Sequence, residues 1–223
     1  MRYWIWIGLW VSLATAKDAA RPFGYDAVVR QVSGNVRLMG PDTSSKEVKV
    51  GDLPQSGEKY AVGEGGGLIV RFHPDFMRIV ARANTMFHLA FSRSDSSELR
   101  DIVLDQGLLA LSASKRGPSL KTEDAHSLVQ AVESRFSFAS ASGVSTTVVL
   151  AGEVKLRNTV TNQVETVHRG QKAVSDSTGV KLTTASQADL QEVSAFQNFL
   201  EMDFWNPSTK ESRTLEMEYE TNF

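Results

Sequence analysis

Few residues of this chain stand at spacings that could support chemistry. Its four histidines, at positions 73, 88, 126 and 168, lie far apart, and it has no cysteine, so no zinc-ligand pattern is present. The acid pairs Asp101 with Asp105 and Glu201 with Asp203 have the residue type of a glycosidase site, in which two carboxylates flank the scissile bond. Acids at these spacings are more often surface charge, and no Gly-x-Ser-x-Gly motif supplies a serine nucleophile. We predict no enzymatic activity, no metal and no cofactor.

A glycine-rich run at 63–67 invites comparison with a phosphate-binding loop, in which backbone N–H groups surround an anion. This run lacks the Gly-Lys-Ser/Thr ending and leads into alternating apolar residues from Leu68 to Phe72, which predict a strand rather than a helix. Because glycine readily adopts the positive φ of tight connections, we interpret the run as a turn.

The stretch from Ser145 to Arg157 has the alternation of a strand with one buried face. Its even positions are apolar or small, and a turn at Gly170 closes a hairpin with the residues that follow it. The same pattern occurs near the other end of the chain, where 34–38 matches 152–156 and Gly51 matches Gly170. A matched pair of hairpins therefore brackets one β-domain.

Short strands, separated by turns at intervals of roughly 8 to 12 residues, fill the region between these hairpins. Among them, Asp105-Gln106-Gly107 between two apolar segments predicts a further hairpin. We predict an all-β fold, a solenoid-like or sandwich-like stack of short strands and hairpins with a C-terminal amphipathic helix. The repeated glycine-capped strands favour the solenoid-like arrangement. The glycines predicted at structural turns are Gly34, Gly51, Gly107, Gly152 and Gly170.

The first sixteen residues have the layout of a secretory signal peptide: Arg2, an apolar run at 3–13, and the small-x-small site Ala14-Thr15-Ala16. The apolar run is shorter than the ~20 residues of a membrane-spanning helix, so we expect cleavage before Lys17 rather than an uncleaved anchor. The expected organisation is a signal peptide at 1–16, a linker at 17–27, a β-domain at 28–184 and an acidic helical tail at 185–223. We expect a periplasmic or secreted protein with no integral membrane span after cleavage, and the balanced charge gives no reason to expect nucleic acid.

Ser186, followed three residues later by Asp189, forms a capping box and predicts a helix that continues to about Phe204, before Asn206-Pro207. The helix face predicted to bind a partner consists of Leu190, Val193, Phe196, Phe199, Leu200 and Trp205. Two interpretations stay open. The helix either caps one end of the β-domain and protects its edge strands, or docks in the groove of a partner.

The order and spacing of these motifs resemble the FecR-type domain, a bacterial family of exported β-domains. The resemblance spans about Val28 to Val174 and rests on Gly34-Asn35-Val36-Arg37-Leu38, Val50-Gly51-Asp52-Leu53, Gly57, Val62 with Gly63 to Gly67, Leu68 to Phe72, Leu104-Asp105-Gln106-Gly107, Phe136 to Phe138, Gly152-Glu153-Val154-Lys155-Leu156 and Gly170-Gln171. Glu133-Ser134-Arg135 stands where the family usually has Gly-Thr. The best-known members also carry a cytoplasmic segment that handles a sigma factor, whereas only two residues precede the apolar run here. The resemblance therefore implies a stand-alone envelope module and does not by itself imply sigma-factor regulation.

Two functions from different classes follow. The first is a non-enzymatic cell-envelope protein whose FecR-like domain binds a protein partner in signalling or envelope assembly, with the tail as a cap or docking element. The second is a module that binds cell-wall glycan. An apolar patch continuous with the tail helix would favour the protein partner, whereas a groove lined by aromatic side chains would favour the glycan.

Overall fold

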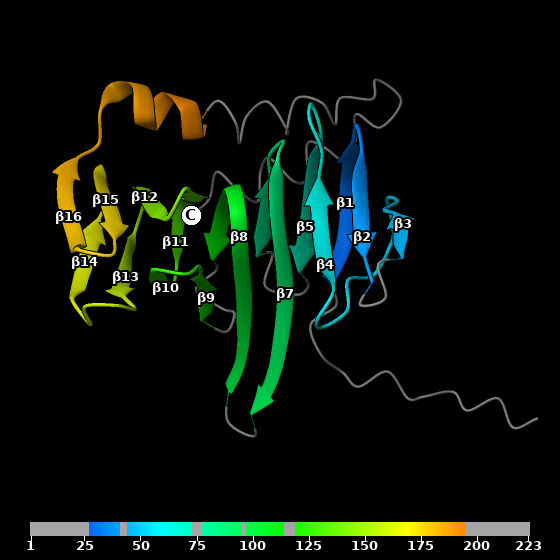
Figure 1. Ribbon diagram of the computed structural model, residues 1–223, viewed down its shortest axis with the longest axis horizontal. Helices are drawn as coiled ribbons and strands as arrows, with labels where there is room; N and C mark the ends of the chain where they lie inside the picture. The colour runs from blue at the N-terminus through cyan, green and yellow to red at the C-terminus, as the bar shows by residue number, and fades with distance from the viewer. Residues whose placement is uncertain (1–26, 41–43, 73–76, 95–96, 114–118, 195–223) are drawn as a thin grey trace, which may run out of the picture.

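The computed structural model describes residues 27–40, 44–72, 77–94, 97–113 and 119–194. These residues are mostly in strands, followed by one helix whose described part covers 187–194 (Figure 1). The strands are β1 (Ala27–Ser33), β2 (Val36–Met39), β3 (Ser45–Glu47), β4 (Lys59–Val62), β5 (Gly67–Phe72), β6 (Arg78–Ala81), β7 (Thr85–Ser94), β8 (Ser97–Ala113), β9 (Leu120–Glu123), β10 (Ser127–Ala131), β11 (Ser134–Ala141), β12 (Val144–Ala151), β13 (Glu153–Asn158), β14 (Val164–His168), β15 (Gln171–Asp176) and β16 (Gly179–Thr184). Within the same ranges, no helix combines the length and hydropathy needed to cross a bilayer.

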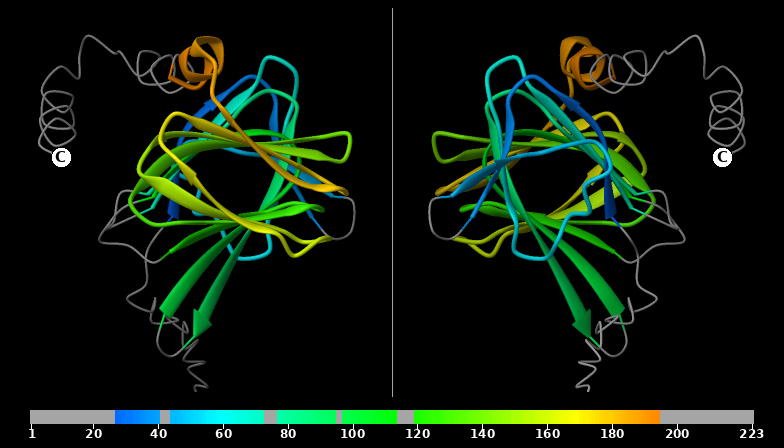
Figure 2. Two further views of the ribbon diagram at one scale, coloured as in Figure 1. Left: turned by 90° about the vertical axis from the view of Figure 1, so that its left-hand side faces the viewer. Right: turned by 90° about the vertical axis from the view of Figure 1, so that its right-hand side faces the viewer.

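The strands form two sheets that share β8. Sheet A has the order β1-β5-β6-β8-β11-β12-β15-β16, and sheet B has the order β3-β2-β4-β7-β8-β9-β10-β13-β14. Seen along the long axis, the strands surround a common interior (Figure 2). The all-β prediction with a C-terminal helix is confirmed. The sequence left a solenoid-like and a sandwich-like arrangement open. Solenoid coils of the β-helix type pair in parallel, whereas among the described strands only β8 and β9 do so. Antiparallel pairing across two facing sheets is that of the sandwich-like arrangement.

The shared strand β8 corrects the prediction of a hairpin at Asp105-Gln106-Gly107. The chain does not reverse there: residues up to Gln106 pair with β7 in sheet B, and residues from Gly107 pair with β11 in sheet A. Gly107 has a φ of 102°, and a Cβ at this position would lie 2.5 Å from the Thr85 backbone. The Thr85 hydroxyl accepts a hydrogen bond from Leu108 N (3.1 Å) and donates one to Leu108 O (3.2 Å). Glycine therefore serves here as a bend inside one long strand rather than as a turn.

The stretch from 145 to 157, predicted as one strand, is two. Gly152, with a φ of 72°, is a corner at which the chain leaves β12 in sheet A and enters β13 in sheet B. Gly34 makes the same corner between β1 and β2, with a φ of 61°. The likeness extends further, because Gly51 N donates to Val29 O (2.8 Å) as Gly170 N donates to Val149 O (2.9 Å). The two segments that match in sequence therefore share a glycine corner and a bond from a later glycine, although Val29 stands five residues before its corner and Val149 three before its own.

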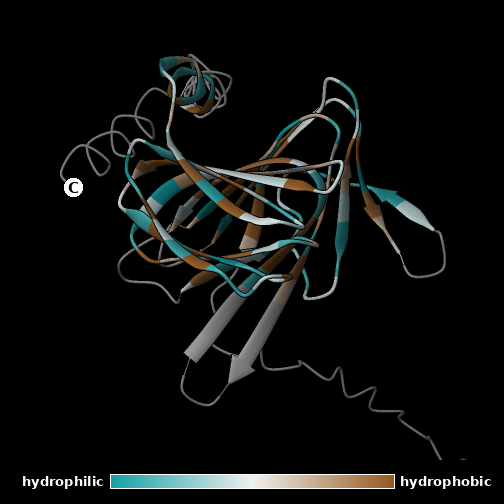
Figure 3. Ribbon diagram, turned by 60° about the vertical axis from the view of Figure 1, so that its left-hand side comes forward, coloured by the Kyte–Doolittle hydropathy of each residue, from teal (hydrophilic) through white to brown (hydrophobic). Residues whose placement is uncertain are grey.

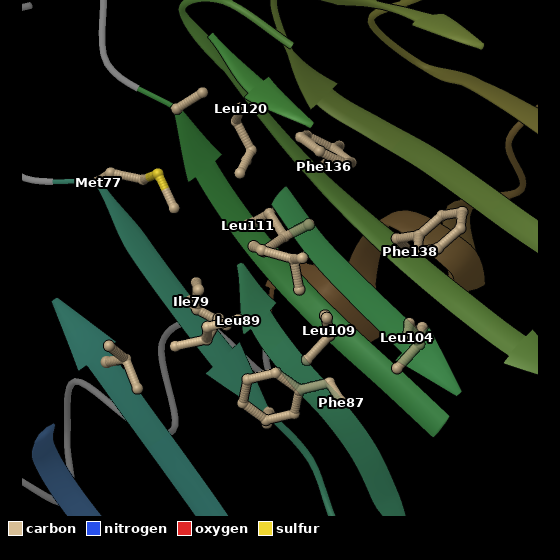
Figure 4. Close-up of a cluster of buried hydrophobic side chains, with 14 of the residues drawn as sticks. Met77, Ile79, Phe87, Leu89, Leu104, Leu109, Leu111, Leu120, Phe136 and Phe138 are labelled. Atoms are coloured by element: carbon tan, nitrogen blue, oxygen red, sulfur yellow. The ribbon is translucent and has the colours of Figure 1, made fainter. Parts of the chain in front are cut away.

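The core lies between the two sheets and is filled by residues that alternate along the strands (Figures 3 and 4). Phe72, Phe136 and Phe138 come from sheet A and Phe87 from sheet B, and all four are at most 1% exposed. Burying one such side chain stabilises a fold by about 1.5–3 kcal/mol. Nearer the C-terminal end the interior also contains polar side chains. Buried Asn158 donates to Ser175 Oγ (2.9 Å) and Asp176 O (2.7 Å), which ties β13 of sheet B to β15 of sheet A.

Candidate functional site

A row of buried side chains crosses the outer face of sheet A, away from the core. In the strand register, each member of this row is the direct neighbour of the next across β5, β6, β8, β11 and β12. The members, which we call the outer row, are Ile69, Val80, Ala110, Ser137 and Val148. Their exposures lie between 1% and 4%, although the outer face of a two-sheet fold is ordinarily solvated and polar.

The local sequence explains why sheet A is apolar on both faces. In β12, Val149 points into the core while Val148 and Leu150 point outward. In β5, Leu68 and Val70 point inward and Ile69 points outward. Continuous apolar runs of this kind belong to strands that are covered on both sides. Sheet A is therefore a middle layer. Its inner face packs on the core, and its outer face requires a further layer of its own.

The helix supplies part of that layer, and it begins at the predicted capping box. Ser186 N and Ser186 Oγ both donate to Asp189 Oδ2, at 2.9 and 2.6 Å, and Asp189 N donates to Ser186 Oγ at 3.1 Å. These bonds satisfy N–H groups that the first turn of a helix leaves without partners. The start of the helix is thus fixed by two side chains in reciprocal contact.

Apolar side chains attach this helix to sheet A. Val193 is 5% exposed and packs with Val148 and with Ala185, the residue that precedes the capping box. Leu190 and Leu150 pack against the same cluster. The helix lies outside the strands, with its axis across them (Figures 1 and 2). It covers the Val148 end of the outer row.

Two ion pairs join the helix to the body. Lys172 Nζ on β15 lies 2.8 Å from Asp189 Oδ1, and Arg82 Nη1, just after β6, lies 2.8 Å from Glu192 Oε1. The Lys172 ammonium and the Ser186 hydroxyl lower the pKa of Asp189 to about 2. The pair of Arg82 and Glu192 is largely exposed and contributes at most about 1 kcal/mol. Its position matters more than its strength, because it shows that the helix advances from β15 toward β6.

The predicted partner-binding residues fall into two groups. Leu190 and Val193 are held on the body as described above, whereas Phe196, Phe199, Leu200 and Trp205 lie outside the described residues. The sequence interpretation did not identify the outer row. The signal that could have done so is the doubled apolar pattern at 68–70, 79–81 and 148–150, where both strand faces are apolar.

The outer face of sheet B has a different character, because it carries charged side chains in mutual contact. Lys59 Nζ lies 2.7 Å from Asp105 Oδ2, and His88 Nδ1 lies 4.0 Å from the same oxygen. Lys121 lies 3.6 Å from Asp101 and 3.0 Å from Glu123. Burial acts to lower the pKa of Lys121, but the carboxylates of Glu123 and Asp101 outweigh it and raise that pKa.

This face does not assemble the chemistry that the sequence raised as an alternative. Asp101 and Asp105 are four residues apart on one strand, which places them about 13 Å from each other, beyond the separation of glycosidase carboxylates. Each is instead paired with a lysine. Among the described residues, no three side chains of the histidine, aspartate and glutamate types converge as metal ligands would. His73, Glu201 and Asp203 lie outside the described residues.

Comparison with known proteins adds information on the fold. No protein-family model matches the sequence, and no curated protein matches it significantly. Two crystal structures of a putative anti-sigma factor from Parabacteroides distasonis, at 1.65 and 2.50 Å resolution, are similar in structure, each with a TM-score of 0.51 and 16% sequence identity. The similarity covers 62% of this chain and 63% or 64% of those chains. At this identity it shows a shared fold.

Proposed function

We propose that this chain is an exported, non-enzymatic FecR-type module that binds a protein of the cell envelope in signalling or assembly. The observation that carries the proposal is the apolar outer row, continuous with a helix that begins an amphipathic tail. The row is at most 4% exposed, so it is a covered face of sheet A, and its described cover is the start of that tail. The fold shared with chains described as a putative anti-sigma factor supports a regulatory role.

The contact in this proposal is made by the tail. Leu190 and Val193 anchor the helix to sheet A, and Phe196, Phe199, Leu200 and Trp205 meet the partner. An amphipathic segment with apolar residues at these spacings suits a hydrophobic groove on another protein. The body then holds the start of the docking segment in a fixed place, which lowers the entropy that binding must overcome.

A cross-linking experiment in the cell envelope tests the function. The exported chain is compared with a version that ends at Ala185 and with the matched surface variant Lys46→Gln, which changes one exposed residue of β3. We expect the full chain and Lys46→Gln to capture one and the same protein, and the truncation to lose it. Capture of the same protein by the truncation would overturn the assignment of the contact to the tail.

The glycan alternative receives no support from the described residues. The aromatic side chains described, those of Tyr60, Phe72, Phe87, Phe136 and Phe138, are all buried. A hollow of about 380 Å³ between the β2–β3 hairpin and residues 55–58 is lined by Met39, Lys46 and Glu58 among others, with no aromatic ring. Equal co-sedimentation of the full and truncated chains with purified cell wall would restore this alternative.

Export itself is tested at the N-terminus of the mature protein. We expect that the protein recovered from the periplasm or the medium begins at Lys17, because Ala14-Thr15-Ala16 has the small-x-small pattern of a signal-peptidase site. Mass spectrometry of the recovered protein measures this directly. Recovery of the intact chain in the membrane fraction would instead identify an uncleaved anchor.

A further inference from the structure

Three buried hydroxyl groups in the interior have no hydrogen-bond partner among the described residues. They are Thr122 Oγ1 on β9, Ser127 Oγ on β10 and Thr147 Oγ1 on β12, and all three residues are 0% exposed. Each lies two positions along its strand from a core residue, so each faces the space between the two sheets. Buried hydroxyl groups in folded proteins are almost always paired, because an unpaired one has lost its bonds to water. These three groups therefore need a partner that the described chain does not supply.

A direct bond between the sheets shows which strands face each other here. Asn158 Nδ2 on β13 donates to Ser175 Oγ on β15 at 2.9 Å. On the side toward β8, the direct neighbour of Asn158 is Ser127 on β10. On the same side, the direct neighbour of Ser175 is Ser145 on β12. Ser127 and Ser145 therefore face each other across the interior, in the same layer as the Asn158 bond.

The two threonines lie in the next layer along the strands. Thr147 follows Ser145 by two positions on β12. Val129 follows Ser127 by two positions on β10, and its direct neighbour on β9 is Thr122. Two positions along a strand cover ~7 Å. The three unpaired hydroxyl groups thus line two successive layers of one part of the interior.

The side chains in this part are short, which leaves room between the sheets. Facing sheets lie ~10 Å apart, and Asn158 spans that space to bond Ser175 directly. A serine side chain is one bond shorter than that of asparagine. In the next layer, the direct neighbour of Thr147 on β15 is a small residue, Ala173. The facing pair of Ser127 and Ser145 therefore leaves a gap that is too wide for a direct hydrogen bond and has the size that a bridging water fills.

The turn between β9 and β10 fixes the polar end of this region. Asp124 Oδ1 accepts hydrogen bonds from His126 N and Ser127 N, both at 2.9 Å. Asp124 Oδ2 accepts one from Ser145 Oγ at 2.6 Å. The carboxylate is therefore paired, whereas Ser145 Oγ can still accept a bond. What the region offers is a set of neutral hydroxyl groups, each of which suits a small neutral molecule that both donates and accepts.

We propose that the interior between β9, β10 and β12 is a binding site for ordered water, which links Thr122, Ser127 and Thr147. A buried water typically makes about three hydrogen bonds, and these hydroxyl groups together with Ser145 Oγ supply them. The water joins strands of sheet B to a strand of sheet A at a place where their side chains are too short to meet. The site is separate from the outer row and does not depend on what the tail binds.

Replacing one hydroxyl group with a methyl group tests the site, because a hydrated and an unpaired hydroxyl give opposite results. In the purified full chain, Thr147→Val keeps the shape of the side chain. We expect it to deprive the water of a partner and to raise the unfolding equilibrium constant, measured in urea by circular dichroism, about fivefold or more. The matched control Thr146→Val, on the outer face of the same strand, should change this constant less than about twofold. A constant that falls or stays unchanged in Thr147→Val would mean that the hydroxyl is unpaired, and would overturn the proposal.

A second measurement detects the water itself and begins with the unaltered chain. Oxygen-17 relaxation dispersion of the purified full chain should reveal long-lived water, and the double variant Thr122→Val with Thr147→Val should reduce its amount. Thr146→Val should leave the amount unchanged. Absence of long-lived water in the unaltered chain overturns the proposal even if the double variant fails to fold, and an equal amount in a folded double variant does so too. Because both experiments use the purified chain alone, their outcome is independent of whether any partner is captured in the envelope.

Discussion

The outer faces of the two sheets differ although the sheets share one core. The outer face of sheet B carries Lys59, Asp105, Lys121 and Asp101 in mutual contact, and these side chains are suited to water. The outer face of sheet A carries Ile69, Val80 and Val148, which are as buried as the core itself. The comparison teaches that sheet B is an external layer, whereas sheet A is an internal one that the described part of the helix covers at Val148.

The largest effect is expected when a charge is placed in the outer row. Val80→Asp should lower the free energy of unfolding by about 3 kcal/mol or more, because it buries a carboxylate without a dedicated partner. The matched variant Ala61→Asp, on the outer face of sheet B, should cost less than about 1 kcal/mol, as ordinary surface changes do. Urea unfolding followed by far-UV circular dichroism measures both. Equal losses in the two variants would remove the distinction between the faces.

A smaller effect is expected from the helix anchor. Val193→Ala removes two buried carbon atoms from the contact with Val148, which should weaken docking of the helix by about 1.5 kcal/mol. The backbone amides of 187–194 should then exchange with solvent roughly tenfold faster, while those of β11 keep their rate. Gln191→Ala, on an exposed position of the same helix, is the control. Unchanged exchange in Val193→Ala would mean that the helix is held by its cap and ion pairs alone.

The ion pair of Asp189 makes the docking dependent on pH. Its pKa falls from an ordinary value of 3.8 to about 2 when the protein is folded. A lowered pKa stabilises the folded form above the unfolded pKa, and this contribution is lost as the pH falls from about 4 to about 2. Amide exchange of 187–194 should therefore accelerate over this window. Asp189→Asn should show little change across the same window, and an identical profile in the variant would assign the effect to other carboxylates.

The smallest effects are expected from exposed ion pairs on either face. Arg82→Gln on the helix side and Lys59→Gln on sheet B should each change the free energy of unfolding by less than about 1 kcal/mol, because solvent screens both pairs. High salt should reduce even this difference. A loss above 2 kcal/mol in Arg82→Gln alone would show that the ion pair, rather than the apolar row, determines the contrast between the two faces.

Much of the fold could be predicted from local patterns, and the exceptions have identifiable physical causes. Alternation gave the all-β class, and the Ser186 and Asp189 spacing gave the helix start, because both signals act within a few residues. The turn predicted at Gly107 failed because glycine permits a positive φ in a bulge as well as in a turn. The prediction of a single strand at 145–157 was wrong because the positions that face the core change at Gly152. They are odd-numbered before it and even-numbered after it.

The candidate site was predicted in part for a related reason. The anchors Leu190 and Val193 belong to a helical pattern that is readable in one segment. The outer row is assembled from five strands that are up to 79 positions apart, from Ile69 to Val148, and only the strand register brings them together. The single hint in the sequence was that runs such as Val148-Val149-Leu150 are apolar at every position, which a strand with one solvated face does not need.

Strand β8 has a consequence for how the two sheets assemble and come apart. Because it pairs with β6 and β11 in sheet A and with β7 and β9 in sheet B, neither sheet is continuous until residues 97–113 are in place. Before it, β1, β5 and β6 pair in one group and β2, β3, β4 and β7 in another, and β8 joins the two groups. Once it is in place, β8 is a strand of both sheets, so a change that displaces it opens both sheets at once.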